Sequence, residues 1–148
     1  MDTFKLDYRL EKDCIKLGYL EGSMVLLMNN SLVPWLILVP VMNSESSVYE
    51  FDLLPREHQI SLLDQINQLS GFLRYQFQFD KLNIATIGNI VQQLHIHIVA
   101  RSENDYCWPA VVWGAEDRKC WSEKEVIEIN QQLASFLTKN YKSLHSLI

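Results

Sequence analysis

The sequence predicts an α+β domain in which about five antiparallel strands form a sheet, with helices packed on one of its faces. Short apolar runs are separated by turn-forming residues, one stretch of about 25 residues has helical periodicity, and most predicted strands are joined by short turns. A doubly wound parallel sheet would need a helix between most strand pairs, and this order does not supply them. A chain of 148 residues, 48% of them hydrophobic, suits a single domain spanning residues 1–148.

The first part of the chain predicts a short amphipathic helix or turn, followed by three strands. The helix or turn is expected over Phe4 to Asp13. Apolar runs predict strands over Ile15 to Leu20 and over Met24 to Met28, and Glu21-Gly22-Ser23 between them suits a hairpin turn. Prolines bracket a further compact strand, Trp35 to Val39.

The second part predicts a long helix, two more strands and a final helix. The long helix is expected between Pro55 and Phe79, because apolar residues recur there every three or four positions: Ile60, Leu63, Ile66, Leu69, Leu73 and Phe77. Strands are expected over Lys81 to Ile87 and Gln93 to Val99. Ser122 followed by Glu125 has the spacing of a capping box, which predicts the start of the final helix.

Charge and cysteine content exclude several classes of partner. The net charge of −5, the pI near 5.3 and the scattered basic residues argue against a protein that coats nucleic acid or an anionic membrane. The longest apolar stretch, Leu32 to Met42, contains two prolines and is shorter than the roughly 20 residues that span a bilayer. Cys14, Cys107 and Cys120 form no C-x-x-C pair, so we expect reduced thiols and a cytoplasmic protein.

The segment from Gln93 to Val99 alternates polar and apolar residues. A strand with this period sends its apolar residues to the core and directs Gln93, His95 and His97 to the other face, about 6.5 to 7 Å apart. Two imidazoles and an amide at this spacing could surround one phosphoryl group. Imidazole has an ordinary pKa of about 6.5, so a neutral ring of His95, the middle residue, could attack phosphorus. His97 or the Gln93 amide would donate hydrogen bonds to the phosphoryl oxygens.

Two alternatives remain for these histidines. Histidines on a strand are often packing or solvent-facing residues. His-x-His is also a common metal-ligand pair, and a metal on His95 and His97 would need a third ligand, for which the nearest candidates are Cys107, Cys120 and Glu103. None of the three has a diagnostic spacing.

The segments around this strand resemble a known family. The run QQLHIHIVAR, preceded by Asn83 and Gly88-Asn89 and followed by CWPAVVWG, resembles the histidine triad (HIT) superfamily of nucleotide hydrolases and transferases. The segments VLLMNN and PWLILVP extend the resemblance, which covers about Cys14 to Gly114. More closely, the chain resembles a bacterial branch of HIT hydrolases, which commonly carries Gln in place of the first triad histidine.

The resemblance implies a half-barrel of five antiparallel strands with a long helix, paired as a homodimer through the helix and the sheet edge. Such enzymes bind a nucleoside monophosphate unit, attack its α-phosphate with the middle histidine and release the nucleotide from a nucleotidyl-histidine with water. Neither a cofactor nor an obligatory metal is implied. The implied substrates are small purine nucleotides, either phosphoanhydrides or phosphoramidates, such as diadenosine polyphosphates and adenylates.

By position, the resemblance makes His95 the nucleophile and His97 a phosphate-binding residue that helps to orient the ring. Asn83 and the turn Gly88-Asn89 would contact phosphate, and Asn29 or Asn30 would lie near the ribose. Trp108-Pro109 and Trp113-Gly114 could form an aromatic flap over a base or a dimer contact, or could serve as packing anchors.

Three positions depart from the family pattern. Gln93 replaces the first histidine and cannot donate a proton to a poor leaving group, so turnover would be slow or restricted to substrates with an acidic leaving group. Asn89 stands for the family's glutamine, and Asn30 for an acidic residue on the ribose. The alternative function is therefore a nucleotide-binding module with weak catalysis.

Overall fold

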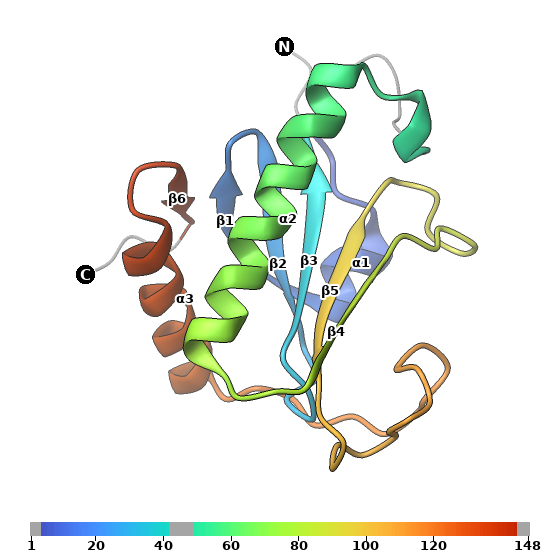
Figure 1. The fold of residues 1–148 in the computed structure, drawn as a ribbon, viewed down its shortest axis with the longest axis vertical. Helices are drawn as coiled ribbons and strands as arrows, with labels where there is room; N and C mark the ends of the chain where they lie inside the picture. The colour runs from blue at the N-terminus through green and yellow to red at the C-terminus, as the bar shows by residue number, and fades with distance from the viewer. Residues whose placement is uncertain (1–3, 42–48, 145–148) are drawn as a thin grey trace.

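A computed structural model describes residues 4–41 and 49–144. Within these residues the chain forms one antiparallel sheet of six strands in the order β4-β5-β3-β2-β1-β6 (Figure 1). The strands are β1 (Cys14–Leu20), β2 (Ser23–Met28), β3 (Trp35–Pro40), β4 (Lys81–Ala85), β5 (Ile96–Arg101) and β6 (Tyr141–Ser143). The predicted α+β class and antiparallel sheet are confirmed. The predicted count of five strands is wrong, because β6 adds a short strand at the outer edge of β1.

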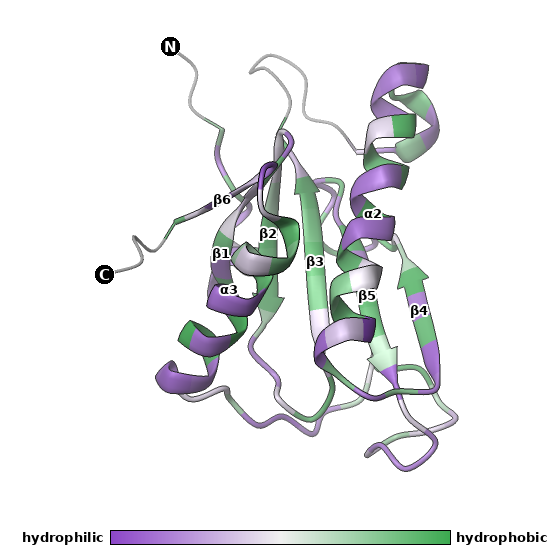
Figure 2. Cartoon of the chain, turned by 60° about the vertical axis from the view of Figure 1, so that its left-hand side comes forward, coloured by the Kyte–Doolittle hydropathy of each residue, from purple (hydrophilic) through white to green (hydrophobic). Residues whose placement is uncertain are grey.

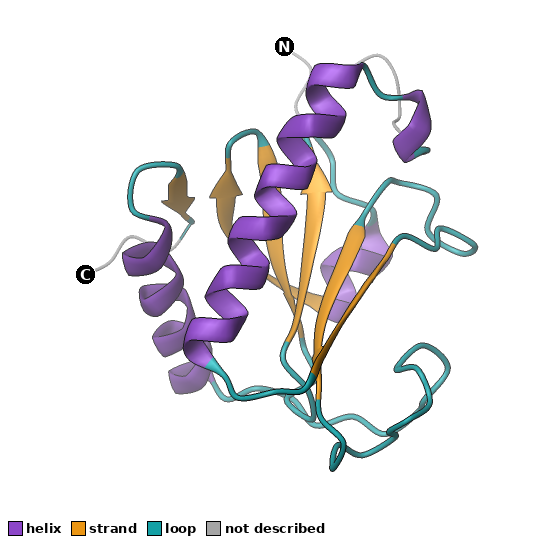
Figure 3. Ribbon diagram, viewed as in Figure 1, coloured by secondary structure: helices purple, strands orange, loops and turns teal. Residues whose placement is uncertain are grey.

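The helices cover both faces of the sheet. The long α2 (Arg56–Gln76) and the C-terminal α3 (Glu123–Leu137) pack on one face, and the short α1 (Tyr8–Asp13) lies on the other (Figures 1 and 3). The prediction that helices occupy one face is therefore correct for the two long helices only. A single 3-10 turn, η1 (Phe51–Leu53), precedes α2. The capping box that starts α3 is present, with Ser122 as the N-cap.

Strand alternation divides the core into two layers. Along the central strand β3, Leu36 and Leu38 face α2 and α3, whereas Trp35 and Ile37 face α1. Each buried side chain of this size stabilises the fold by about 1.5 to 3 kcal/mol. In Figure 2 the central strands are green along most of their length, and purple gathers on the helices. Because the α1 side has its own apolar layer, polar residues on that face stand out as candidates for function.

The buried side of α2 differs from its predicted apolar face. Ile66, Leu69 and Leu73 are buried as predicted, but Ile60 and Leu63 are 48% and 54% exposed. In the first half of the helix, the buried residues are Leu62, Gln65 and Ile66, so the helix is rotated from the predicted orientation. Gln65 is a polar residue at a core position, where its amide binds the Ser23 hydroxyl and the Glu21 carbonyl oxygen. A hydrophobic pattern cannot predict such a position, because only the tertiary contacts supply its partners.

Candidate active site

His95 and His97 lie side by side in a pocket of about 590 Å³ on the α1 side of the sheet. Their ring centroids are 5.0 Å apart, and the residues are only 6% and 5% exposed. The segment from Ile87 to Val91, between β4 and β5, and the segment from Val112 to Arg118, after β5, form much of the wall. As predicted, the alternate residues Leu94, Ile96 and Ile98 join the core beneath the helices.

Strand β5 begins at Ile96, three residues later than the sequence predicts. His97 is therefore a strand residue, whereas His95 and Gln93 belong to the irregular segment that leads into the strand. The alternation of faces continues through His95, but the conformation before Ile96 is set by tertiary hydrogen bonds and not by a strand partner.

The protonation of His97 follows from its partner Trp35 on β3. The Trp35 Nε1–H donates to His97 Nδ1 at 3.0 Å, and an indole nitrogen can only donate. Nδ1 is therefore the acceptor, and the ring proton of neutral His97 is on Nε2. Burial, together with the nearby His95, lowers the pKa of His97 from 6.5 to about 3. At neutral pH His97 is thus an uncharged hydrogen-bond donor.

His95 has the opposite arrangement. Its Nδ1 lies 2.6 Å from the backbone carbonyl oxygen of Gln93, and a carbonyl oxygen can only accept. The proton of neutral His95 is therefore on Nδ1, which leaves the lone pair on Nε2. One ring of the pair presents a nucleophilic nitrogen and the other presents an N–H group, which is the combination that attack on a phosphoryl group requires.

The Gln93 side chain does not join the two histidines in this pocket. Its Oε1 accepts from the backbone N–H of Asp7 at 2.9 Å, and its Nε2 donates to the carbonyl oxygen of Lys5 at 3.0 Å. Gln93 instead lines a second pocket, next to the first. The two histidines therefore project into one recess, as predicted. The predicted third member, the Gln93 amide, points instead to the N-terminal segment.

The predicted nucleotide-binding residues divide into two groups. Asn30, Gly88 and Asn89 line the histidine pocket. Asn29 does not line it, because its side chain accepts from the backbone N–H of Trp121 at 3.0 Å. Asn83 does not line it either.

Asn30 is 6% exposed and anchors the pocket wall. Its Oδ1 accepts from the backbone N–H groups of Leu32 and Lys119, and its Nδ2 donates to the Asp117 carbonyl oxygen. These bonds connect the end of β2 to the wall after β5. Much of the hydrogen-bonding capacity of Asn30 is therefore used within the protein.

Asn83 supports a buried ion pair that the sequence did not reveal. Its Oδ1 accepts from Arg101, which is 1% exposed and makes a bidentate contact with Asp105 at 2.8 and 3.1 Å. Burial opposes ionisation of Asp105, but the Arg101 hydrogen bonds hold its pKa at about 2. Arg101 also donates to the Ala110 carbonyl oxygen and lies 5.6 Å from the Trp108 ring centre. This cluster fixes the loop that carries the wall tryptophan.

That wall tryptophan is Trp113. Its ring centroid lies 5.2 Å from His97 and 6.1 Å from Trp35, both edge-on. Trp113 and Gly114 line the histidine pocket, whereas Trp108 packs on the Arg101 cluster. The Trp113 Nε1 atom is buried and has no hydrogen-bond partner in the part of the chain that the structure describes. A bound ligand with an acceptor would satisfy such a donor.

The alternatives can be weighed on the same geometry. Across residues 4–41 and 49–144, no group of three His, Cys, Asp or Glu side chains is placed to hold a metal ion. The third ligand that a metal on His95 and His97 would need is thus missing there.

The three cysteines are unpaired. No helix in the described ranges is long and apolar enough to cross a membrane.

Comparison with known proteins identifies the family. The chain matches the HIT domain over residues 9–104. No curated protein matches it. Among solved structures, it is similar to a histidine triad protein from Sinorhizobium meliloti 1021, with 38% identity and a TM-score of 0.83 over 90% of this chain and 96% of that one.

Two further crystal structures are equally similar. A histidine triad protein from Bradyrhizobium japonicum has 36% identity and a TM-score of 0.84, over 90% of this chain and 98% of that one. One from Marinobacter aquaeolei VT8 has 36% identity and a TM-score of 0.84, over 93% and 98%. The chain therefore belongs to the histidine triad family.

Proposed function

We propose that this chain is a nucleotidyl hydrolase or transferase that cleaves a purine nucleotide at its α-phosphate, with His95 as the nucleophile. Proteins of the histidine triad family generally act on nucleotide substrates. The observation that carries the proposal is the opposite protonation of the two rings, which the Gln93 carbonyl oxygen and the Trp35 indole impose.

In the first step, the His95 Nε2 lone pair forms a bond to the α-phosphorus, and the bond from phosphorus to the leaving group breaks. The leaving group departs with that electron pair. The positive charge that develops on the imidazole is stabilised by the Nδ1–H bond to the Gln93 carbonyl oxygen, 2.6 Å away. In the second step, water attacks phosphorus and the N–P bond breaks, so that its electron pair returns to His95 Nε2. The nucleoside monophosphate leaves, a proton of the attacking water passes to solvent, and His95 is neutral again.

His97 would bind the phosphoryl oxygens. Because the pKa of His97 is about 3, its ring stays neutral at physiological pH. It can donate a hydrogen bond to a phosphoryl oxygen but does not act as a general acid. Gln93 cannot serve as an acid either, because a carboxamide does not release a proton. The leaving group must therefore depart as a stable anion, which favours phosphoanhydrides over phosphoramidates of basic amines.

The base of the nucleotide would occupy the apolar part of the histidine pocket. Met28, Trp35, Val112 and Trp113 line this part, and aromatic side chains stack well on a purine. Asn30, Gly88 and Asn89 border the same pocket and would approach the ribose and the phosphate. No step of this mechanism needs a metal or a cofactor.

We further propose that the protein is a cytoplasmic homodimer. The unpaired thiols fit a reducing compartment. Strand β4 is an edge of the sheet and exposes Ile84 at 47%, and α2 exposes Ile60 and Leu63. Exposed apolar side chains at a sheet edge favour association with a second copy.

The test is to trap the covalent intermediate. The wild type is mixed with ADP that is radiolabelled at the α-phosphate, the reaction is quenched, and the protein is analysed for acid-labile, base-stable label. We expect label on the wild type and on His58→Ala, a control at an exposed position of α2. His95→Ala should carry no label and lose on the order of 10⁴-fold in kcat.

Label that persists on His95→Ala would refute the assignment of the nucleophile. The binding-module alternative predicts a different result. In that case the wild type and His95→Ala turn over ADP equally slowly, while both still bind it in a fluorescence titration of the pocket tryptophans.

A further inference from the structure

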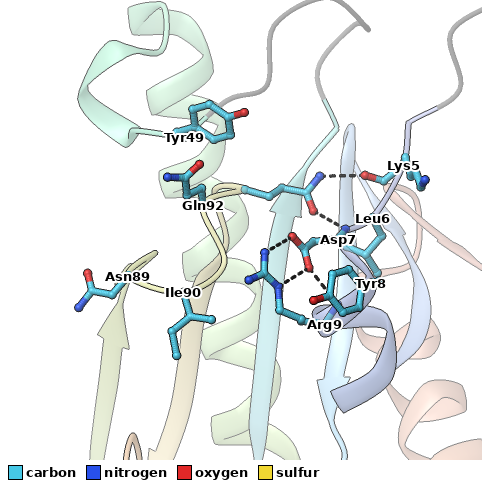
Figure 4. Close-up of a pocket in the computed structure, with 10 residues that line it drawn as sticks. Lys5, Leu6, Asp7, Tyr8, Arg9, Tyr49, Asn89, Ile90 and Gln92 are labelled. Atoms are coloured by element: carbon cyan, nitrogen blue, oxygen red, sulfur yellow. Dashed lines mark hydrogen bonds and ion pairs between the residues drawn. The ribbon is translucent and has the colours of Figure 1, made fainter.

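A second pocket, of about 470 Å³, adjoins the histidine pocket, and three residues line both: Arg9, Asn89 and Ile90. Figure 4 shows Lys5, Asp7 and Arg9 along one side of it, and Asn89, Ile90 and Gln92 along the other. The two pockets therefore share part of their walls. A substrate with its base against the tryptophans and its α-phosphate at His95 would direct its leaving group toward this shared wall.

Arg9 is held in a fixed position at the junction of the two pockets. Its Nε and Nη2 atoms donate to the two carboxylate oxygens of Asp7 at 3.0 and 2.9 Å, and its guanidinium lies 5.2 Å from the Tyr8 ring centre. Asp7 is itself fixed, because its carboxylate also accepts from the backbone N–H of Arg9. The Nη1 atom of Arg9 has no hydrogen-bond partner among the residues that the structure describes.

Gln93 connects this segment to the nucleophile. Its backbone carbonyl oxygen binds His95, and its side-chain amide bridges Lys5 and Asp7 across 86 to 88 positions of sequence. A single residue therefore sets both the tautomer of His95 and the position of the segment that carries Arg9. Removing the side chain would release the segment and leave the carbonyl contact to His95 in place.

We infer that the second pocket is the leaving-group subsite, in which Arg9 binds the oxygens of a departing phosphate and Gln93 positions Arg9. This inference rests on the proposed function. When the bond from the α-phosphorus to the bridging oxygen breaks, the electron pair remains on that oxygen, and the guanidinium offsets the new negative charge. No proton is transferred, because Arg stays protonated at all working pH values. Lys5 adds a second cation to the same pocket.

This arrangement gives Gln93 a role that differs from that of an acid. An acid would protonate the leaving group, whereas a fixed guanidinium stabilises an anion. The subsite therefore selects nucleotides whose leaving group is a phosphate or a polyphosphate chain. Phosphoramidates of basic amines gain nothing from it, since their leaving group needs a proton.

The experiment compares two substrates that share a nucleoside and differ in the leaving group. ADP whose β-phosphate already carries one proton releases hydrogenphosphate, and the p-nitrophenyl ester of AMP releases nitrophenolate, which has no phosphate oxygens. For Arg9→Ala we expect kcat/KM to fall about 10- to 100-fold with ADP, mainly through kcat, and less than about 3-fold with the ester. Arg9→Lys should recover part of the loss. Arg74→Ala, an exposed arginine on α2, is the matched control and should change neither rate.

Gln93→Ala tests the positioning role. It should lower the rate with ADP and spare the ester, because the backbone contact to His95 remains. In the double variant Arg9→Ala/Gln93→Ala, the loss should equal that of Arg9→Ala alone, since Gln93 acts through Arg9. Thermal unfolding shows whether each variant is folded. If Arg9→Ala is not folded, the two substrates are compared with Arg9→Lys instead.

The outcomes separate the two proposals. Equal losses with both substrates, or no loss with ADP, would overturn the leaving-group assignment and leave His95 catalysis intact. Additive losses in the double variant would remove the positioning role of Gln93. A wild type that cleaves neither compound, or whose rates are unchanged by His95→Ala, would refute both the subsite and the proposed function.

Discussion

The buried, neutral state of His97 predicts how the stability of the protein depends on pH. His97 is 5% exposed and accepts a hydrogen bond from Trp35, and burial holds its pKa at about 3. In the unfolded chain the same ring has its ordinary pKa of 6.5. Between these two values the unfolded state binds a proton that the folded state does not.

The sign of the effect follows from proton linkage. Stability rises with pH wherever the unfolded state binds more protons, so the contribution of His97 is fully present above pH 6.5 and is lost as the pH falls toward 3. With these pKa values, the free energy of unfolding decreases by about 2 kcal/mol between pH 7 and pH 5 and by about 3 kcal/mol by pH 4. The free energy of unfolding of a small domain is usually about 5 to 15 kcal/mol, so this loss is a substantial fraction of the total.

The assay is urea unfolding of the wild type and of His97→Asn at pH 7 and pH 5. Asparagine does not titrate, and its side-chain oxygen can still accept from Trp35. We expect the wild type to lose about 2 kcal/mol more than the variant on acidification. His58→Asn, on the exposed surface of α2, should behave as the wild type does. Equal acid sensitivity of His97→Asn and the wild type would refute the reasoning.

Two further predictions concern the edges of the sheet. Asn130→Ala should lower the free energy of unfolding in urea by about 3 kcal/mol, because it leaves the Tyr141 hydroxyl unpaired and releases β6. The exposed control Gln131→Ala should cost little. A loss below about 0.5 kcal/mol for Asn130→Ala would contradict the role of this hydrogen bond. At the other edge, light scattering should give a dimer for the wild type and for Ile127→Lys, and a monomer for Ile84→Lys, whose side chain is exposed on β4. A monomeric wild type would refute the proposed dimer.

Some of the candidate site could be predicted from the sequence because the signal was local. The alternation around His95 and His97 is a property of consecutive residues, and the structure places both rings on one face as that alternation requires. The capping box of α3 is equally local, and it forms as predicted. The family resemblance added an ordered set of segments, and the HIT domain match confirms it.

Other parts of the site depend on contacts that no local pattern encodes. Asn29 and Asn30 are neighbours in the sequence. The Asn29 side chain accepts a hydrogen bond from the backbone N–H of Trp121, whereas Asn30 lines the pocket. Asn83, predicted to contact phosphate, does not line the histidine pocket and accepts a hydrogen bond from Arg101. In each case the partner is 18 to 92 positions away, so the pairing exists only once the strands have assembled.

The sequence by itself determined the antiparallel class, the long helices and the two histidines that share a face, because the periods of strand and helix follow from backbone geometry. The tertiary structure alone decided which nitrogen of each ring carries the proton, and that Gln93 faces the N-terminal segment. Those properties depend on hydrogen bonds to Trp35, the Gln93 carbonyl oxygen and Asp7, and such bonds are set by distances across the fold.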